Sequence, residues 1–315
     1  MRRVALIYNP ASGQHSARRK QAVQQVMDVL RAAGVEVEAF VTDTPGSATT
    51  HAEEAVRSGY DAILACGGDG TVHEVLQSLV GTDVALGVIP LGTANALASN
   101  LGLAGAPVKA ARALLGASPT RVPVGRIHFQ NGRGPESRYF LVAAGVGADA
   151  LLMSRLDPKL KRRLGYILYM IEAFKIWATD PLPLFQAEFS SNGHGPDSVA
   201  EVSQLLAVRV RSFGGALREF APGATLHSPA LHLIAFGTRS RYLYLRFLLA
   251  VLAGRHTFAS KIQLVETATV DCRARNGSQE TLYVEADGEV LGHLPARMET
   301  VPDALMLLVP EGAQP

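Results

Sequence analysis

The chain has 315 residues, of which 48% are hydrophobic and 18% charged, and its formal net charge is +2. This length favours two domains or one large one, and the composition is that of a globular protein with a sizeable core. The small net charge excludes a strongly basic nucleic-acid-binding protein, so no nucleic-acid partner is expected. The two cysteines, Cys66 and Cys272, give no disulfide framework and fit a reducing compartment.

No segment is predicted to cross a membrane. The apolar run that follows Arg3 is about five residues long, against roughly 7–15 in the core of a signal peptide. The longest apolar stretch, 242–254, is interrupted by Arg246 and is shorter than the roughly 18 residues that span a bilayer. We therefore expect a cytoplasmic protein with no integral anchor.

The first part of the chain, up to about residue 120, alternates short apolar runs with helical patterns. Helix 16–33 is predicted from apolar residues at helical spacing, and Thr50 and Glu53 have the spacing of a capping box at the start of the next helix. Such alternation is typical of βα units around a mostly parallel sheet. The predicted strands are 3–10, 35–42, 61–66 and 84–90.

After residue 120 the pattern becomes one of strands separated by Gly, Pro and Asn turns, which predicts a largely antiparallel β domain. One of these strands is predicted over 260–274, and the polar stretch 190–201 is predicted to be a loop. Two helices, 160–177 and 242–253, interrupt the strands.

A glycine-rich loop stands at the end of the third predicted strand. Gly67, Gly68 and Gly70 surround Asp69 directly before a helical pattern. Glycine lets a ligand approach the main chain, and N–H groups at a helix start attract phosphate. A carboxylate inside such an anion site suggests an intervening cation, for which nucleotide-bound Mg²⁺ is the natural candidate. The alternative is a simple Asp-Gly turn.

Two further loops follow neighbouring strands: 8–13, and 90–98 with Gly92, Thr93 and Asn95. Each loop alone is also explained as a helix cap. Because the carboxyl ends of parallel strands meet at one edge of a sheet, three such loops predict a ligand site there.

The motifs NPASG, GGDGTVHEV and PLGTANALASNLGL, with VEADGEV near the C-terminus, resemble the diacylglycerol kinase catalytic family. This family includes bacterial lipid kinases and is related to the sphingosine kinases. The resemblance covers nearly the whole chain. It implies a nucleotide-binding α/β domain over 1–122, similar to that of phosphofructokinases and NAD kinases. It also implies a lipid-binding antiparallel β-sandwich over 123–315, whose last ~20 residues pack back on the first domain, with the active site between the two.

The resemblance implies ATP as phosphate donor and Mg²⁺ as cofactor, with Asp69 as the catalytic residue that holds the nucleotide's Mg²⁺. Phosphoryl transfer needs donors around the phosphates, neutralised charge and a deprotonated acceptor hydroxyl. The loop 67–71, called the glycine loop below, and the loop 92–95, called the GTAN loop, are expected to supply the hydrogen-bond donors. The predicted nucleotide-binding residues are Asn9, Pro10, Ser12, Gly13, Thr42, Gly67, Gly68, Gly70, Thr71, Glu74, Gly92, Thr93 and Asn95.

Asp287 and Glu289 are two residues apart, and on a strand they would face the same side. Two carboxylates beside a substrate hydroxyl could combine base and metal roles. Similar kinases use this DGE pair as the catalytic base and its partner. The alternative is a β-turn with Asp-Gly at its tip.

The chain departs from the family pattern where related bacterial enzymes carry acidic residues that bind a structural Mg²⁺. His227 and Ser228 stand at those positions, followed by Pro229. Neutral histidine is a poor ligand for a hard cation. The structural Mg²⁺ is therefore predicted to be absent. A soft-metal pair formed by His227 and His232 is the less favoured alternative.

The segments 157–177 and 240–256 combine basic residues with apolar and aromatic ones. Such helices suit transient contact with an anionic membrane surface, and we expect a peripheral location at the inner membrane. The alternative is that both helices pack on the β domain.

The sequence thus predicts an ATP-dependent lipid kinase, with diacylglycerol the leading substrate. Phosphatidylglycerol, ceramide and sphingoid bases remain open as acceptors. The alternative hypotheses are an NAD-kinase-like enzyme with a soluble substrate and a catalytically silent lipid-binding protein. A homodimer is compatible with the sequence.

Overall fold

A computed structural model describes residues 1–10, 16–156, 166–190, 198–213, 221–254, 261–275 and 281–313. The chain divides into two compact units. The first contains residues 1–124 and 302–315, and the second contains residues 125–301.

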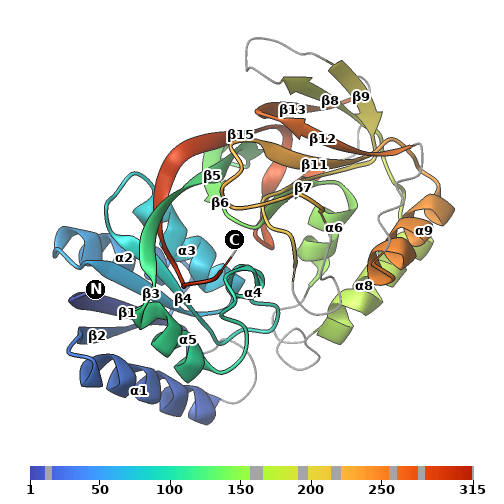
Figure 1. The fold of residues 1–315 in the computed structure, drawn as a ribbon. Helices are drawn as coiled ribbons and strands as arrows, with labels where there is room; N and C mark the ends of the chain where they lie inside the picture. Colours follow the sequence, from blue (N-terminus) through green and yellow to red (C-terminus); the bar gives the residue numbers. More distant parts are fainter. Residues whose placement is uncertain are drawn as a thin grey trace. The chain divides into compact units, whose positions relative to one another are not determined.

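The first unit is a parallel sheet with helices between its strands (Figure 1), which confirms the predicted α/β part. The strand order is β2-β1-β3-β4, and the end of β15 pairs parallel with β4 through Leu307 and Leu86. Strands β3 and β4 are buried along their whole length, as expected for parallel strands covered on both faces. The elements are β1 (Arg3–Tyr8), α1 (Ser16–Ala32), β2 (Glu36–Val41), α2 (Ser47–Arg57), β3 (Ala62–Gly67), α3 (Asp69–Leu79), β4 (Ala85–Pro90), α4 (Ala96–Asn100) and α5 (Pro107–Leu115).

Helix α2 begins earlier than the sequence predicted. Its N-cap is Gly46, and Thr50 lies inside the helix, where its hydroxyl contacts the Gly46 carbonyl at 3.4 Å. The predicted capping box of Thr50 and Glu53 is therefore wrong. The N–H of Ala48 instead donates to the Glu74 carboxylate on α3 at 3.1 Å, so a tertiary contact satisfies the helix start.

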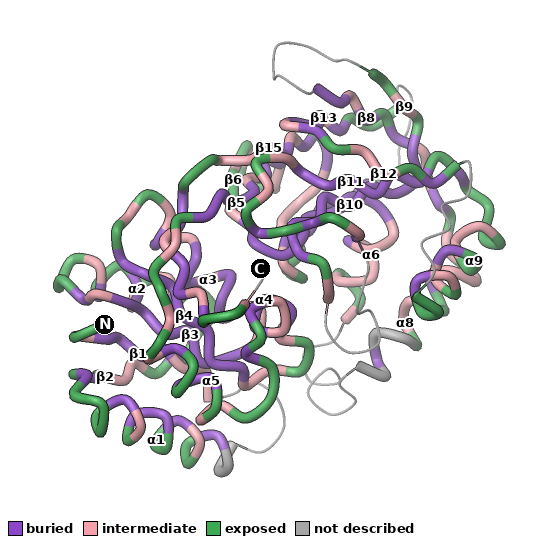
Figure 2. Tube along the Cα trace, in the orientation of Figure 1, coloured by how far each residue is buried: buried purple, intermediate pink, exposed green. Residues whose placement is uncertain are grey.

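The second unit is built from antiparallel strands with three described helices, and the antiparallel β part of the prediction is confirmed. The strand order β12-β11-β10-β7-β14-β15 is extended by β13, which pairs with β15 and β8. Figure 2 shows the buried stretches of these strands in purple. The elements are β5 (Ser118–Asn131), which starts in the first unit, β6 (Gly134–Phe140), β7 (Ala143–Val146), α6 (Ala148–Arg155), α8 (Tyr166–Thr179), β8 (Phe185–Ser190), β9 (Ser198–Val202), β10 (Gln204–Val208), β11 (Leu231–Phe236), α9 (Arg241–Leu252), β12 (Ile262–Thr267), β13 (Thr269–Ala274), β14 (Tyr283–Ala286) and β15 (Glu289–Val309), which ends in the first unit.

Two strand predictions need correction. The predicted strand 260–274 is two strands, β12 and β13, which separate at Ala268 and pair with β11 and β15, respectively. Part of the predicted loop 190–201 is strand β9, which pairs with β8. Residues 191–197 lie outside the described residues. Cross-strand pairing, which a polar sequence pattern does not reveal, explains the second error.

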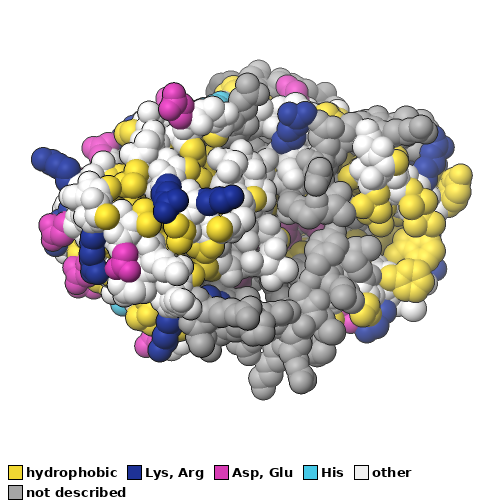
Figure 3. Space-filling view, turned by 60° about the horizontal axis from the view of Figure 1, so that its bottom comes forward, with side chains coloured by type: hydrophobic (Ala, Val, Ile, Leu, Met, Phe, Trp, Pro, Cys, Tyr) yellow, Lys and Arg dark blue, Asp and Glu magenta, His cyan; other side chains and the backbone are white. Residues whose placement is uncertain are grey.

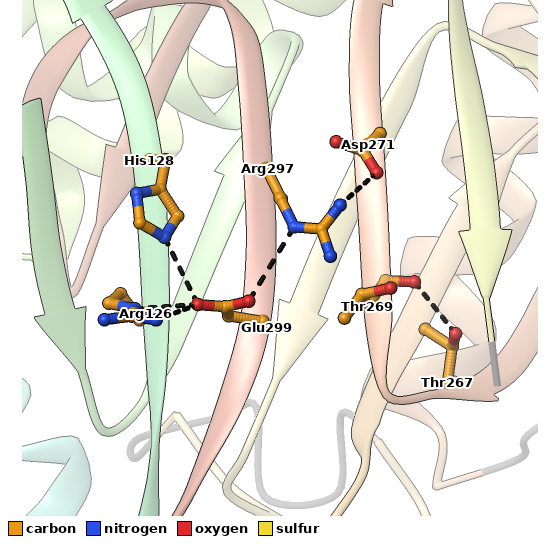
Figure 4. A network of polar contacts seen from close by, with 7 residues as sticks. All are labelled: Arg126, His128, Thr267, Thr269, Asp271, Arg297 and Glu299. Atoms are coloured by element: carbon orange, nitrogen blue, oxygen red, sulfur yellow. Dashed lines mark hydrogen bonds and ion pairs between the residues drawn. The ribbon is translucent and has the colours of Figure 1, made fainter. Parts of the chain in front are cut away.

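A network of charged side chains ties β5, β15 and β13 together (Figure 4). The carboxylate of Glu299 on β15 pairs with Arg126 and lies 3.2 Å from Nε2 of His128, both on β5. Arg297, two residues before Glu299, donates to Asp271 on β13 at 2.9 Å. Arg126 and His128 together lower the pKa of the half-buried Glu299 carboxyl against the opposing effect of burial.

Helices α8 and α9 belong to the second unit, and Trp177 Nε1 on α8 donates to the Arg241 carbonyl at the start of α9 at 2.8 Å. The predicted helix 160–177 is described only from residue 166 onward, and residues 157–165 lie outside the described residues. No helix in the described part of the chain is long and apolar enough to cross a membrane.

Candidate active site

The glycine loop and the GTAN loop lie against each other at the carboxyl edge of the parallel sheet. The N–H of Leu91, after β4, donates to the Gly67 carbonyl at the end of β3 at 2.8 Å. A side-chain carbon added at Gly92 would lie 2.4 Å from the Cα of Gly68, which no residue other than glycine allows without moving the main chain. The two loops thus present bare backbone at one place, as phosphate binding requires.

Asp69 is the first residue of α3, and Gly68 precedes it as N-cap. Its Oδ1 accepts a hydrogen bond from the N–H of Ala96 at the start of α4, at 2.8 Å. Asn95 adopts the left-handed region at φ 49°, and its amide exchanges two 2.9 Å hydrogen bonds with the backbone of Gly92. Asp69 therefore joins two of the predicted motifs through one carboxylate oxygen.

The other described residues of the predicted nucleotide site lie on the same sheet edge. The N–H of Asn9 donates to the Cys66 carbonyl at 3.4 Å, and the buried Thr42 contacts the Tyr8 carbonyl through its N–H and hydroxyl. Thr71 is buried, while Thr93 is exposed. The Glu74 carboxylate accepts the hydrogen bond from the Ala48 N–H at the start of α2, as described above. Ser12 and Gly13 lie outside the described residues.

Arg19 on α1 contacts the first of the predicted loops, and the sequence analysis did not identify it. Its side chain is only 6% exposed, and its guanidinium donates to the carbonyl of Pro10 in the first loop. Burial lowers the pKa of this guanidinium from its ordinary value. The residue holds the Asn9–Pro10 stretch next to the glycine loop. A run of basic residues after a phosphate-binding loop is the signal that could have indicated it.

The chemistry of these residues fits a nucleoside triphosphate with Mg²⁺. The close approach of Gly68 and Gly92 leaves the backbone there free of side chains, and Asp69 offers a carboxylate, the ligand type that Mg²⁺ prefers. Within the described residues, no three His, Cys, Asp or Glu side chains are grouped so that they could hold a metal ion by themselves. Mg²⁺ commonly takes few protein ligands and completes its shell with phosphate and water, so Asp69 alone suffices on the protein side.

In the second unit, Asp287 and Glu289 do not lie together on a strand. Ala286 on β14 pairs with Glu289 on β15, and Asp287 and Gly288 form the two-residue connection, with φ 49° and 83°. Two successive positive φ values are those of a type I′ turn, which Asp-Gly favours. The expectation that both carboxylates project from one strand face is therefore wrong, because Asp287 and Gly288 form the turn itself.

The Asp287 carboxylate is anchored by backbone donors from 141–143. Its Oδ2 accepts from Leu141 N–H at 3.0 Å, and its Oδ1 accepts from Val142 and Ala143 N–H at 2.8 and 3.1 Å. The N–H of Asp287 returns a 2.8 Å hydrogen bond to the Ala143 carbonyl. Glu289, by contrast, is exposed. The turn thus holds one carboxylate rigidly and presents the other to solvent.

Two carboxyl groups are buried near this turn, Glu285, which contacts it, and Asp149, and the sequence analysis identified neither. Glu285 is 5% exposed, and its Oε2 accepts from the Gly288 N–H at 2.8 Å. Glu285 pairs with Gly145 on the adjacent strand β7. The Asp149 carboxylate lies so close to Gly145 that a side-chain carbon added there would be 1.6 Å from it. Burial raises the pKa of Asp149 to about 7, and burial together with the charge of Asp149 raises the pKa of Glu285 well above its ordinary value.

These raised pKa values predict that stability falls as the pH rises. The folded state holds the two protons more tightly than the unfolded chain, so the stabilisation is complete below the ordinary carboxyl pKa near ~4 and is lost toward pH 7 and above. In Glu285→Gln, whose amide can still accept from Gly288 N–H, the decrease between pH 5 and pH 7.5 is expected to be smaller. Urea unfolding at both pH values measures it, with exposed Glu289→Gln as control. An unchanged pH dependence in Glu285→Gln would contradict the assignment.

The loop that precedes β11 holds the residues at which acids were expected. His227 is exposed, and the Ser228 hydroxyl contacts Nε2 of His232 at 3.1 Å. His232 is 4% exposed, and burial lowers the pKa of its ring. Its Nδ1 lies 3.5 Å from Glu266 on β12. His227 and His232 thus occupy different surroundings, one exposed and one buried.

Residues 3–127 match the model of the diacylglycerol kinase catalytic domain, and residues 141–309 match that of the YegS C-terminal NAD kinase beta sandwich-like domain. The chain is 28% identical to a diacylglycerol kinase of Bacillus subtilis over 99% of this chain and 97% of the relative. It is 31% identical to a diacylglycerol kinase of Mycobacterium tuberculosis, over 98% and 95% of the two chains.

Solved structures share the fold. A crystal structure of a diacylglycerol kinase from Bacillus anthracis covers 99% of this chain and 98% of its own, with a TM-score of 0.71 and 20% identity. Yeast NADH kinase in complex with NADH covers 98% of this chain and 83% of its own, with a TM-score of 0.52 and 10% identity.

The fold and the glycine loops define a kinase built from an α/β catalytic domain and an NAD-kinase-like β-sandwich. The chain belongs to the diacylglycerol kinase family and is a lipid kinase, a phosphotransferase with an alcohol group as acceptor. The predicted family and fold class are confirmed.

Proposed function

We propose that this protein transfers the γ-phosphate of ATP, with Mg²⁺, to the free hydroxyl of diacylglycerol. The observation that carries the proposal is the contact between the glycine loop and the GTAN loop, joined by Asp69. The names of the relatives from Bacillus subtilis and Mycobacterium tuberculosis support diacylglycerol as the acceptor.

On the donor side, the backbone N–H groups of Gly68 and of the start of α3 would hold the phosphates, and Asp69 would hold Mg²⁺ directly or through water. The Gly92 N–H donates to Oδ1 of Asn95, so Gly92 contributes room for the phosphates and no hydrogen-bond donor. Bound Mg²⁺ neutralises the charge of the transferred phosphoryl group. Arg19 keeps the first loop in place through the Pro10 carbonyl. Because Oδ1 of Asp69 caps α4, any shift of the GTAN loop also shifts the carboxylate.

On the acceptor side, Glu289 is the general base that removes the proton of the lipid hydroxyl. Its carboxyl group is exposed at the end of a rigid turn, whereas the oxygens of Asp287 accept three backbone hydrogen bonds. Asp287 is the partner that fixes the turn. Because the anchored Asp287 fixes the turn backbone, the position from which the Glu289 side chain projects is set before the substrate arrives.

The lipid is reached at a membrane surface through α8 and α9. Phe174 on α8 is 64% exposed, and Tyr242 and Leu249 on α9 are 69% and 56% exposed. Exposed basic residues, Lys175 and Arg246, accompany them. Figure 3 shows hydrophobic side chains gathered at the right edge of the molecule with basic side chains around them. This composition suits an anionic bilayer interface and a peripheral location on the cytoplasmic side.

Removing two of these side chains is expected to weaken membrane binding. In Phe174→Ser/Leu249→Ser, sedimentation with vesicles of phosphatidylglycerol and phosphatidylcholine should show a dissociation constant higher by roughly 100-fold or more, because each side chain loses about 1.5 kcal/mol or more of apolar burial. Val199 on β9, 59% exposed, offers the matched control Val199→Ser. Equal losses in both variants would reject α8 and α9 as the docking surface.

The substrate is tested by transfer of radiolabelled γ-phosphate from ATP with Mg²⁺ to lipids in mixed micelles. Diacylglycerol is expected to be labelled, and phosphatidylglycerol, ceramide and sphingosine are offered in parallel. Preferential labelling of another lipid would replace diacylglycerol as the acceptor. Activity that needs no detergent or vesicle would favour a soluble substrate, and no labelled lipid under any condition would favour a binding protein.

A further inference from the structure

Arg209 follows β10 and is the largest fully buried side chain of the described residues, with 0% of its surface exposed. Arginine is rarely buried completely unless its charge is paired and its donors are used. Neither the nucleotide site nor the proposed base explains a buried cation in the second unit. Its partners therefore indicate what it does.

The guanidinium binds main-chain oxygens of the loop Ala221–Ala230. Nη2 of Arg209 donates to the carbonyls of Leu226 and Ser228, each at 3.2 Å. Carbonyl oxygens are also the ligands that hard divalent cations take from protein loops. In this loop the guanidinium of Arg209 binds two such carbonyl oxygens, those of Leu226 and Ser228.

The same residue is connected to the Asp287 turn. The N–H of Arg209 donates to the carbonyl of Val142 at 2.9 Å, and the N–H of Val142 donates to Oδ1 of Asp287 at 2.8 Å. Burial lowers the pKa of Arg209 to about 10 while the negative charge of Asp287 raises it, so the guanidinium is charged at neutral pH. Arg209 thus joins the loop, the 141–143 segment and Asp287.

The charged groups around this loop leave little place for a metal ion. Where acids were expected, His227 is exposed and Ser228 turns its hydroxyl to His232. The charge of Arg209 also lowers the pKa of His232, which opposes a second positive charge there. A divalent cation at the Leu226 and Ser228 carbonyls would lie beside the guanidinium and be repelled by it. The residues present do not fit a structural Mg²⁺.

We propose that Arg209 is a built-in cation that holds the Ala221–Ala230 loop in place of a metal ion and positions the Asp287 turn. It is a positioning residue, because it acts on the acceptor hydroxyl only through the turn. The catalytic part of this inference rests on the proposed function; the structural part does not.

The structural part is tested by thermal unfolding of the full chain without nucleotide. EDTA and added MgCl₂ are expected to change the midpoint of the wild type by less than about 1 °C. Arg209→Met should lower it by roughly 5 °C or more, since the loop carbonyls and Asp287 lose their cation, and Mg²⁺ should not restore it. Exposed Arg211→Met is the matched control, with a change of about 1 °C or less. A wild-type midpoint that falls by about 3 °C or more in EDTA and recovers with Mg²⁺ would overturn the proposal.

The positioning part is tested by kinetics with the lipid acceptor, at a temperature at which each variant is folded. Arg209→Lys keeps the charge but not the planar fork. We expect its kcat to fall about threefold to tenfold and that of Arg209→Met roughly 10- to 100-fold, with the KM for ATP within about twofold of wild type. A folded Arg209→Met with the wild-type kcat would reject the positioning role.

If the wild type phosphorylates no lipid, the proposed function fails, while the EDTA and thermal comparisons still decide whether Arg209 is the cation that holds the loop. If Arg209→Met does not fold, Arg209→Lys and the EDTA experiment carry the test.

Discussion

Replacing Asp69 by asparagine is expected to lower kcat for lipid phosphorylation by about 100-fold or more, with little change in stability. The amide oxygen of the new side chain would keep the 2.8 Å hydrogen bond from the Ala96 N–H, so the link between the glycine loop and α4 is retained. What is lost is the negative charge that we propose binds the nucleotide's Mg²⁺. Initial rates across a range of Mg²⁺ concentrations, together with urea unfolding, measure both effects.

Asp69→Ala is the companion variant, because it removes the charge and the hydrogen bond together. It should lose activity to the same extent and, in addition, about 1 kcal/mol of stability from the unsatisfied N–H at the start of α4. If Asp69→Asn retained wild-type activity at low Mg²⁺ while Asp69→Ala did not, Asp69 would be a purely structural link between two loops. The metal role proposed for it would then be wrong.

The second large effect is expected at the turn formed by Asp287, Gly288 and Glu289. Substitution of its two carboxylates should have different effects on kcat and on stability. Glu289→Gln is expected to lower kcat by roughly 100- to 1,000-fold without a measurable change in unfolding, since the side chain is exposed. Asp287→Asn should lower both kcat and the free energy of unfolding. The NH₂ group of the new side chain would face at least one of the three N–H donors of Leu141, Val142 and Ala143. We expect a stability loss of about 1–3 kcal/mol.

Rate measurements at one pH value, paired with urea unfolding, distinguish the two roles. Glu289→Gln should lose rate alone, whereas Asp287→Asn should lose both rate and stability. A control is Tyr283→Phe on β14, which changes the same hairpin without touching a carboxylate. Wild-type rates in both Asp287→Asn and Glu289→Gln would show that the turn takes no part in catalysis.

Much of the donor side was predictable because it is local in sequence. The glycine loop, the GTAN loop and the strands before them lie within 35 residues of one another, and parallel strands necessarily bring their carboxyl ends to one edge. The sequence pattern could not show which side chains at this edge make structural hydrogen bonds. Glu74 satisfies the start of α2, and Arg19 holds the Pro10 carbonyl, because both contacts depend on how helices pack on the sheet.

The sequence by itself determined the family, the alternation of strands and helices in the first unit and the presence of an Asp-Gly pair near the C-terminus. Only the tertiary structure decided the surroundings of that pair. Its donors come from residues more than 140 positions earlier. Glu285 supports it from β14, the strand that leads into the turn, and Arg209 supports it from the position after β10. Backbone N–H groups and buried charges carry no sequence signature of their own, because their partners are set by antiparallel pairing between distant segments.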